Sequence, residues 1–143
     1  MTQPPSAPRV RGEVHEAYEL VGGRADAAVF ITCEHASDRF VAPWALRGED
    51  ERLVETHWAS DPGAEALVRG LASLLDAPAV LGRYSRLIID PNRPLDAPTL
   101  FRSLADGLPI LLNSHIGPED RTDRIARLWE PYHLAADRAL FLC

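Results

Sequence analysis

The 143-residue chain contains no lysine, so all fifteen of its basic residues are arginines. A phosphate-binding P-loop requires a lysine, as do Schiff-base chemistry and Ser–Lys catalytic dyads, and the composition excludes these functions. Cysteine is almost as rare, because the chain has only Cys33 and Cys143. Two cysteines do not form a disulfide framework, and a cytoplasmic location is the expectation.

Positive charge is also scarce: 21 acidic residues stand against 15 basic ones, and the formal net charge is −6. Because an acidic chain repels phosphate backbones, we expect no nucleic-acid partner. No apolar run reaches the roughly 18 residues of a membrane span, so we expect no membrane partner either. Residues 1–12 are rich in proline and lack the apolar segment of a secretory signal. They predict a disordered arm, followed by one α/β domain over residues 13–143.

Short apolar runs predict the strands of this domain. Residues 27–33 and 86–90 have the composition of buried strands, and residues 79–81 predict a third, shorter one. Helical patterns lie between and after these runs. Strands that alternate with helices favour a sheet covered by helices.

Two helices are predicted from end signals and periodicity. Asp61 is suited to cap the first, and Pro62 is suited to its first position. Its leucines recur at helical spacing (Leu67, Leu71, Leu74 and Leu75). The last helix begins near Thr122, and Pro131 should bend or split it. One apolar stripe follows that helix (Ile125, Leu128, Tyr132, Ala136 and Leu140).

Polar clusters follow the two longer predicted strands. Residues 34–38 (EHASD) follow the first strand, and residues 90–93 (DPNR) end the second. Ligands of open α/β sheets bind outside the carboxyl ends of the strands. If the two strands are parallel and close, both clusters face one crevice, which is the main functional prediction from the residues alone.

His35 is the candidate metal ligand of the first cluster. Together with Asp38 and the adjacent Glu34, it offers the imidazole and carboxylate donors that suit Zn²⁺ with an open position for water. The alternative is a structural loop in which His35 bonds backbone and Asp38 caps a turn. Cys33 is a candidate nucleophile, although a thiol at the apolar end of a strand is usually structural.

Arg93 and Asn92 are the candidate anion-binding residues of the second cluster. The arginine fork grips a carboxylate, and the asparagine amide adds a directional donor. The alternative is an ordinary ion pair between Arg93 and Asp90 or Asp96.

Four segments, taken in order, resemble the N-formylglutamate amidohydrolase family: residues 31–37 (ITCEHAS), 61–64 (DPGA), 85–93 (SRLIIDPNR) and 131–133 (PYH). The resemblance implies cleavage of the formyl amide of N-formyl-L-glutamate, or of a related N-acyl amino acid, in histidine degradation or a related route. It also implies a phosphorylase/hydrolase-like, three-layer α/β/α fold with a mixed sheet, related to zinc carboxypeptidases.

The resemblance also implies roles for particular residues. His35 and Asp38 would match a His-x-x-Glu motif and hold a divalent metal, Zn²⁺ first of all. Asn92 and Arg93 would bind the carboxylate of the small-molecule substrate. Arg86 would polarise the formyl carbonyl, and Glu34 joins it as a candidate catalytic residue that also competes with Asp38.

Members of the family extend past residue 143, and their second half should carry a later histidine ligand and a general-base glutamate. The expectation is therefore a truncated member with an incomplete fold. One hypothesis is a metal-assisted amide hydrolase. Another is a catalytically incompetent remnant that binds a small carboxylate or a partner chain, a second copy included. A third is a hydrolase that depends on Cys33.

Overall fold

A mixed four-stranded sheet forms the centre of the fold, which the computed structural model describes over residues 8–142. The strand order is β2-β3-β6-β5, with bounds β2 (Glu13–Val14), β3 (Tyr18–Val21), β6 (Ala79–Gly82) and β5 (Ile31–Cys33). β6 runs parallel to β5, with Thr32 opposite Val80, whereas β3 runs antiparallel to both β6 and β2. Every residue of β6 is buried, as its apolar composition predicts for a central strand.

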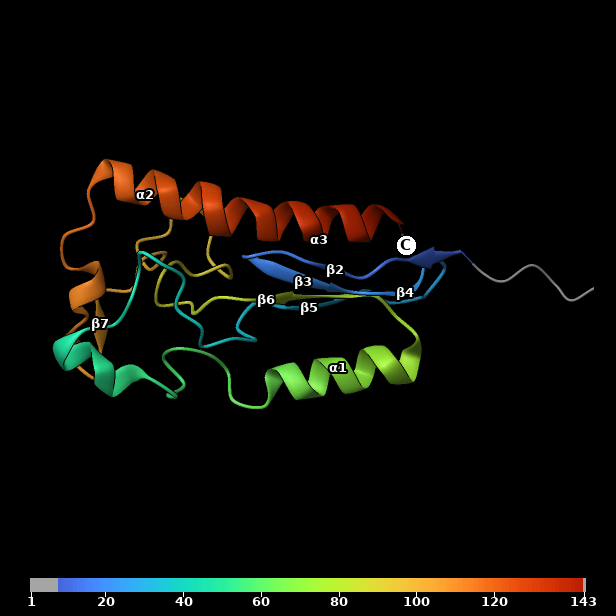
Figure 1. Ribbon diagram of the computed structural model, residues 1–143, viewed down its shortest axis with the longest axis horizontal. Coiled ribbons are helices and arrows are strands. Elements are labelled where there is room, and N and C mark those ends of the chain that lie inside the picture. The colour runs from blue at the N-terminus through green and yellow to red at the C-terminus, as the bar shows by residue number, and fades with distance from the viewer. Residues whose placement is uncertain (1–7, 143) are drawn as a thin grey trace, which may run out of the picture.

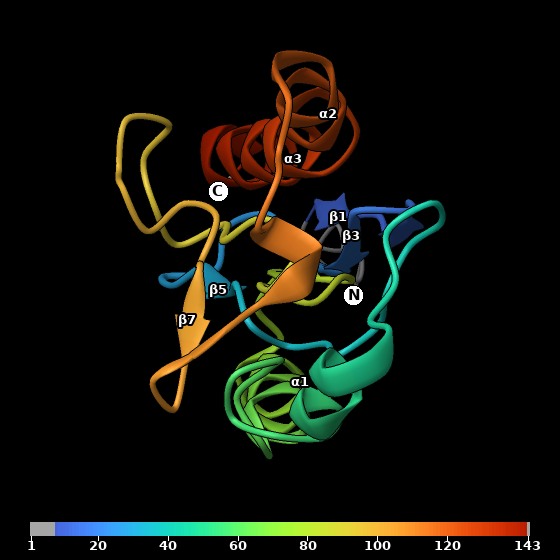
Figure 2. The same cartoon turned by 90° about the vertical axis from the view of Figure 1, so that its left-hand side faces the viewer.

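Helices cover both faces of this sheet, as the two views in Figures 1 and 2 agree. α1 (Ala64–Leu75) packs on one face and α3 (Glu130–Leu142) on the other. Two antiparallel pairs form separate small sheets: β1 (Arg9–Val10) with β4 (Gly23–Arg24), and β7 (Leu104–Ala105) with β8 (Leu108–Pro109). The 3₁₀ helices η1 (Gly48–Leu53) and η2 (Leu111–Asn113) lie in the connections. The predicted mixed α/β organisation is confirmed.

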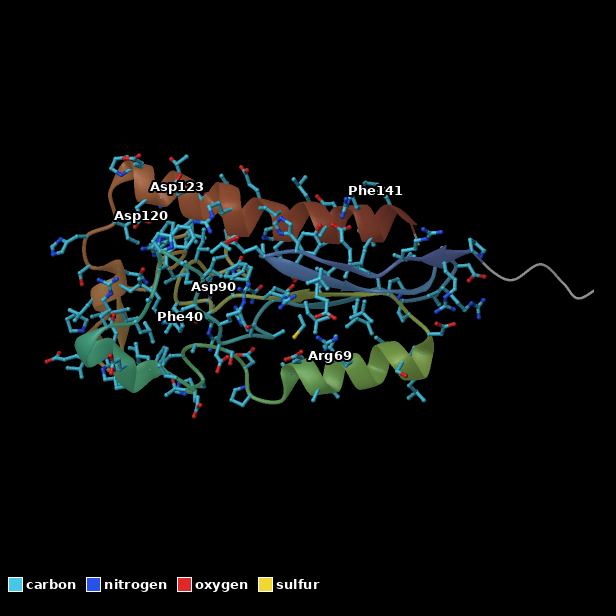
Figure 3. The ribbon with its side chains drawn as sticks, viewed as in Figure 1. Phe40, Arg69, Asp90, Asp120, Asp123 and Phe141 are labelled. Atoms are coloured by element: carbon cyan, nitrogen blue, oxygen red, sulfur yellow. The ribbon has the colours of Figure 1, made fainter. Side chains whose placement is uncertain are left out.

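Helix α1 forms where it was predicted, but it begins later and buries a different face. Its N-cap is Gly63, at φ +82°, and no side chain caps the helix, so the capping role predicted for Asp61 is wrong. The predicted leucine stripe is exposed (Leu67, Leu71, Leu74 and Leu75). Small residues face the sheet instead (Val68 and Ala72). Arg69 points to the sheet in Figure 3 and donates two hydrogen bonds to Glu19 of β3, at 2.8 and 2.7 Å, which fixes this rotation.

The segment predicted as a strand over residues 86–90 is a buried turn. Its apolar side chains are completely buried (Leu87, Ile88 and Ile89), but no strand pairs with them. Side chains satisfy its carbonyls: Asn113 Nδ2 donates to Leu87 and Arg124 Nη1 to Ile88, each at 2.9 Å. Because side chains can replace a neighbouring strand in this way, the apolar run did not require a β-ladder.

The C-terminal helical segment begins at Pro118, earlier than the predicted Thr122. α2 (Pro118–Arg124) passes into the π-helical turn η3 (Ile125–Trp129) and then into α3. Pro131 lies in the first turn of α3, so the irregularity predicted at this proline takes the form of the preceding π turn. The buried stripe follows regular helical spacing (Leu128, Tyr132, Ala135 and Ala139), and the predicted members Ala136 and Leu140 lie outside it.

The arm predicted over residues 1–12 is partly ordered. Strand β1 pairs with β4, and Arg9 forms an ion pair with Asp76 at 2.8 Å, so the prediction does not hold for residues 9 and 10. Residues 1–7 and Cys143 lie outside the described residues. Between residues 8 and 142, no helix combines the length and apolarity needed to cross a membrane.

Candidate functional site

Asp90 is the centre of a buried polar cluster in the interior of the molecule (Figure 3). Its Oδ1 accepts hydrogen bonds from His35 Nε2 at 2.7 Å and from the backbone N–H of Asn92 at 2.9 Å. Its Oδ2 lies 3.9 Å from Arg93 Nε. Burial would raise the pKa of Asp90, but the hydrogen bonds from His35 and Asn92 outweigh it, and the pKa lies below its ordinary value.

The partners of His35 fix the orientation of its ring. In the neutral ring the hydrogen is assigned to Nε2, which faces the Asp90 carboxylate, and Nδ1 is the acceptor. Arg86 Nη1 donates to Nδ1 at 3.0 Å, and Asp61 Oδ2 lies 3.3 Å from the same atom. The backbone carbonyl of His35 in turn accepts from the Asp61 N–H at 2.9 Å. The ring is therefore held on both edges, with 8% of the residue exposed.

Arg86 uses most of its donors inside the protein. Its Nη1 also lies 3.2 Å from Asp61 Oδ1, Nε donates to the Trp58 carbonyl at 3.1 Å, and Nη2 donates to the His57 carbonyl. These contacts assign it to holding His35 and Asp61 in place. To polarise the formyl carbonyl of a substrate, as predicted, Arg86 would need an N–H donor that none of these contacts uses.

The two polar clusters predicted to converge do meet. His35 comes from the end of β5, Arg93 follows the buried turn, and the Asp90 carboxylate lies between them. Asp90 supplies the ion pair weighed as an alternative for Arg93, but the 3.9 Å separation is long for such a pair. Arg93 remains exposed, and its Nη atoms have no partner in residues 8–142.

Glu34, Asn92 and Arg93 line one open pocket of about 540 Å³. Its other walls are mostly carbon (Pro91, Pro94, Leu95, Trp129 and His133). Trp129 Nε1 donates to the Arg93 carbonyl at 3.0 Å, and its ring packs on His133 with centroids 3.9 Å apart. His133 Nε2 bonds the Pro91 carbonyl at 3.0 Å, so helix α3 and the loop after Asp90 hold each other in place. Pockets of this volume accommodate small-molecule ligands.

Gly82 lets the backbone of Glu34 approach the end of β6 closely. A Cβ on Gly82, at the end of β6, would lie 2.4 Å from the Glu34 carbonyl oxygen. The Tyr132 hydroxyl is buried without a hydrogen-bond partner in the described residues. Burial and the nearby Glu34 carboxylate raise the pKa of Tyr132 well above its ordinary value. Burial also lowers the pKa of His133, which favours its neutral form.

Cys33 lies in the apolar cluster between α1 and the sheet. Burial and nearby carboxylates, Glu34 first among them, raise the pKa of its thiol to about 11. A thiol in this state is a poor nucleophile at neutral pH. The geometry therefore disfavours a hydrolase that depends on Cys33.

The described residues do not fit a complete metal site. No group of three or more His, Cys, Asp or Glu side chains that could hold a metal ion occurs among them. The ring edges of His35 face Asp90 on one side and Asp61 with Arg86 on the other, so these carboxylates do not converge on one point with it. Asp38 is exposed, and no hydrogen bond or ion pair links it to His35 within residues 8–142. His35 Nδ1 and Asp61 are the closest approach to a pair of ligands.

Sequence reasoning did not give central roles to three parts of the site. Asp61 was interpreted as a helix cap, Asp90 was considered only as a member of the second polar cluster and a partner for Arg93, and no site role was derived from the residues for Trp129 and His133. Asp61 and His133 belong to two of the four segments that carry the family resemblance, which is the signal that could have placed them near the site. Nothing in the local sequence indicates that α3 would approach the loop after Asp90.

Comparison with known proteins agrees with these segments. A family model described as N-formylglutamate amidohydrolase matches residues 27–141. The crystal structure of gene product Atu2144 from Agrobacterium tumefaciens is similar at 29% identity and TM-score 0.79, covering 87% of this chain and 49% of that one. An N-formylglutamate amidohydrolase from Ralstonia eutropha JMP134 shares the fold at 22% identity and TM-score 0.53, covering 87% and 50%. The chain thus spans about half the length of these solved structures. No curated protein matches it.

Proposed function

Because the chain belongs to the N-formylglutamate amidohydrolase family, we propose that it hydrolyses the amide C–N bond of an N-acyl amino acid. N-formyl-L-glutamate, which would yield formate and glutamate, is the substrate that the family name suggests. We also propose that the fold is part of the three-layer architecture of the zinc carboxypeptidase relatives. A role in histidine degradation and a cytoplasmic location remain predictions.

One observation carries this proposal: an exposed arginine, an asparagine and a glutamate share a pocket. Arg93 presents a guanidinium with free Nη donors, which suits the α-carboxylate common to all N-acyl amino acids. Asn92 stands beside it with an exposed amide. The Asp90 carboxylate positions both by accepting the Asn92 N–H and by lying beside Arg93.

Glu34, which lines the same pocket as Arg93, is the proposed general base. It would accept a proton from water as the oxygen attacks the acyl carbonyl, and it would return that proton to the leaving amine nitrogen. The Tyr132 hydroxyl near Glu34 is buried and has no hydrogen-bond partner in the described residues. Arg86 and Asp90 would hold the His35 ring from its two edges, and Arg86 is a positioning residue in this scheme.

A divalent metal such as Zn²⁺ would supply a bound water of lowered pKa. His35 with Asp38, the pair predicted to hold it, does not form a site in the described residues, so no step above depends on it. Metal analysis of the purified protein, before and after His35→Ala, tests this separately.

Formate release from N-formyl-L-glutamate, coupled to formate dehydrogenase, tests the proposal. We expect Arg93→Ala to raise KM by about tenfold or more, because the paired carboxylate contact is worth about 1.5–3 kcal/mol. Glu34→Gln should lower kcat by about 10² or more. Arg11→Ala, an exposed arginine outside the pocket, is the matched control and should change neither constant.

Turnover that Arg93→Ala and Glu34→Gln leave unchanged would contradict the assignment of this pocket. Binding of the substrate without turnover would favour the second hypothesis, a carboxylate-binding protein without catalysis.

A further inference from the structure

A second, smaller pocket of about 200 Å³ lies on the face of the sheet that α1 covers. α1 supplies two of its lining residues, and the ends of β5 and β6 supply others, because Ala36 follows β5 and Gly82 closes β6. Ligands of α/β proteins bind at the carboxyl ends of parallel strands, and both strands end here. The polar side chains that line the pocket are Glu19, Ser37, Arg39, Glu65, Arg69 and Arg83.

Both acidic side chains of this pocket are bound to the same arginine. Arg69 donates to the two carboxylate oxygens of Glu19, at 2.8 and 2.7 Å, and to Glu65 at 2.9 Å. The hydrogen bond from Arg69 holds the pKa of Glu19 below its ordinary value. Three guanidinium groups therefore stand against two carboxylates in the lining, and Arg39 and Arg83 take no part in these ion pairs. The pocket is locally positive although the chain as a whole is acidic.

Hydrogen bonds hold Ser37, Arg39 and Arg83 close together. The Arg39 N–H donates to Ser37 Oγ at 3.1 Å, and Arg39 Nε donates to the Arg83 carbonyl at 2.7 Å. The Arg39 carbonyl accepts from the Ser85 N–H at 2.8 Å, and Arg39 Nη2 donates to the Glu16 carbonyl. The Arg39 guanidinium is thus oriented by the protein itself, which reduces the entropy lost when a ligand binds.

Three polar groups of this cluster are available to a ligand. The Ser37 hydroxyl accepts a hydrogen bond and still has its own O–H to donate. Arg39 Nη1 and the Arg83 guanidinium form no hydrogen bond or ion pair within residues 8–142. Burial and the Arg83 charge lower the pKa of Arg39, so the two cations disfavour each other, and an anion close to both would be attracted by both.

We propose that this pocket binds a small tetrahedral oxyanion through Ser37, Arg39 and Arg83, either a phosphate ion or the phosphate group of a small molecule. A phosphate offers enough acceptor oxygens for a hydroxyl and two guanidinium groups at once, whereas a carboxylate has only two oxygens. The pocket is smaller than the roughly 300 Å³ at which sites for drug-sized ligands begin, which suits a compact ion. None of the three residues lines the pocket of Arg93, so this proposal is independent of the proposed hydrolase activity.

Calorimetric titration of the full chain with inorganic phosphate, at constant ionic strength, tests the site. Arg83→Gln should weaken phosphate binding by about tenfold or more, because it removes a charged hydrogen-bond donor. The melting temperature without phosphate should not change, since the Arg83 side chain has no hydrogen bond or ion pair within the described residues. Arg11→Gln, which removes an exposed arginine outside the pocket, is the matched control and should bind phosphate like the wild type.

Two further ligands define the chemistry that the pocket recognises. Acetate should bind at least about tenfold more weakly than phosphate, because it cannot reach all three donors at once. Glycerol 3-phosphate separates the two sources of the anion: tighter binding than that of inorganic phosphate would identify the phosphate group of a small molecule, and weaker binding would identify the free ion. Either order supports the site when Arg83→Gln weakens the ligand that binds more tightly.

Arg93→Ala establishes where the anion binds. It should leave phosphate binding unchanged, because Arg93 lines the other pocket. Loss of phosphate binding in Arg93→Ala together with normal binding in Arg83→Gln would overturn the proposal. So would a wild-type chain that does not bind phosphate, an equal effect of Arg83→Gln and Arg11→Gln, or acetate that binds as tightly as phosphate. Formate release is measured separately, so failure of this proposal is distinct from failure of the proposed function.

Discussion

Replacing Asp90 by asparagine tests the centre of the site. The carboxylate accepts two hydrogen bonds on Oδ1, from His35 Nε2 at 2.7 Å and from the Asn92 N–H at 2.9 Å, and 4% of the residue is exposed. Asp90→Asn keeps an acceptor oxygen but removes the negative charge that strengthens both bonds. A hydrogen bond to a charged group contributes about 1.5–3 kcal/mol, so we expect a loss of about 2 kcal/mol at pH 7. For a domain of this size the melting temperature should fall by about 8 °C.

The pH dependence of this loss follows from the lowered pKa of Asp90. A carboxyl whose pKa is lower in the folded state stabilises the fold above its unfolded value, about 3.9, and loses that contribution as pH falls through the folded value. The difference between wild type and Asp90→Asn should therefore be full at pH 7 and shrink below about pH 4. Urea unfolding followed by circular dichroism at pH 7, 5, 4 and 3.5 measures it.

Asp96→Asn is the matched control, since Asp96 is exposed in the loop after the site. Its effect should stay within about 0.5 kcal/mol at every pH. The reasoning would be refuted if Asp90→Asn unfolded with the same free energy as the wild type at pH 7. It would equally be refuted if the loss were as large at pH 3.5 as at pH 7.

Three further predictions concern the structure around the site. Gly82→Ala should destabilise the protein by about 1–3 kcal/mol, because its Cβ would lie 2.4 Å from the Glu34 carbonyl oxygen; Gly117→Ala, where a Cβ meets nothing within 4 Å, is the thermal-melting control. Arg124→Leu should lower the free energy of unfolding by about 3–5 kcal/mol, because it removes a fully buried guanidinium and leaves its buried acceptors without a hydrogen bond. An unchanged urea midpoint would contradict this prediction. In a Cys143→Ser background, the Cys33 thiol, whose pKa is raised to about 11, should react with a disulfide reagent far more slowly at pH 8 than a cysteine in the unfolded chain. Equal reaction rates for the folded and unfolded chains would contradict this prediction.

The sequence predicts the helical regions and two of the four strands of the central sheet, β5 and β6, because their patterns are local; β2 and β3 were not predicted. The apolar run before Cys33 and the short run at residues 79–81 both form parallel strands at the predicted places. Gly63 replaces Asp61 as the cap of α1 because the chain turns through a positive φ there, which only the three-dimensional path of the loop decides. The leucines of α1 are exposed for a similar reason: the Arg69–Glu19 contact and the small residues facing the sheet, which are tertiary contacts, set the rotation of the helix.

The sequence predicts that two polar clusters converge, but not the contacts that connect them. Polar clusters after apolar runs predicted that His35 and Arg93 lie close together, and both reach Asp90 in the structure, whereas their functional roles stay predictions. The expectation assumed two parallel strands, whereas the second segment is a turn. Local patterns did not predict the pocket walls from η3 and α3 either, because Trp129 and His133 meet the loop after Asp90 through contacts between residues more than thirty positions apart.

The buried Arg124 explains how an irregular segment can hold the Asp90 carboxylate in a defined position. Residues 87–89 lack a neighbouring strand, so their position depends on the donors that reach their carbonyls from Asn113 and Arg124. Arg124 also donates to Asn113 Oδ1 at 2.7 Å and to Asp120 Oδ2 at 2.8 Å, which joins α2 and η2 to the buried turn. Asp90 comes directly after this turn, and its own N–H donates to the Leu100 carbonyl. The position of the carboxylate that contacts His35, Asn92 and Arg93 therefore depends on a polar network that binds the residues before it. A sequence pattern built from apolar periodicity does not detect such a network, because its members are single polar residues spread over distant parts of the chain.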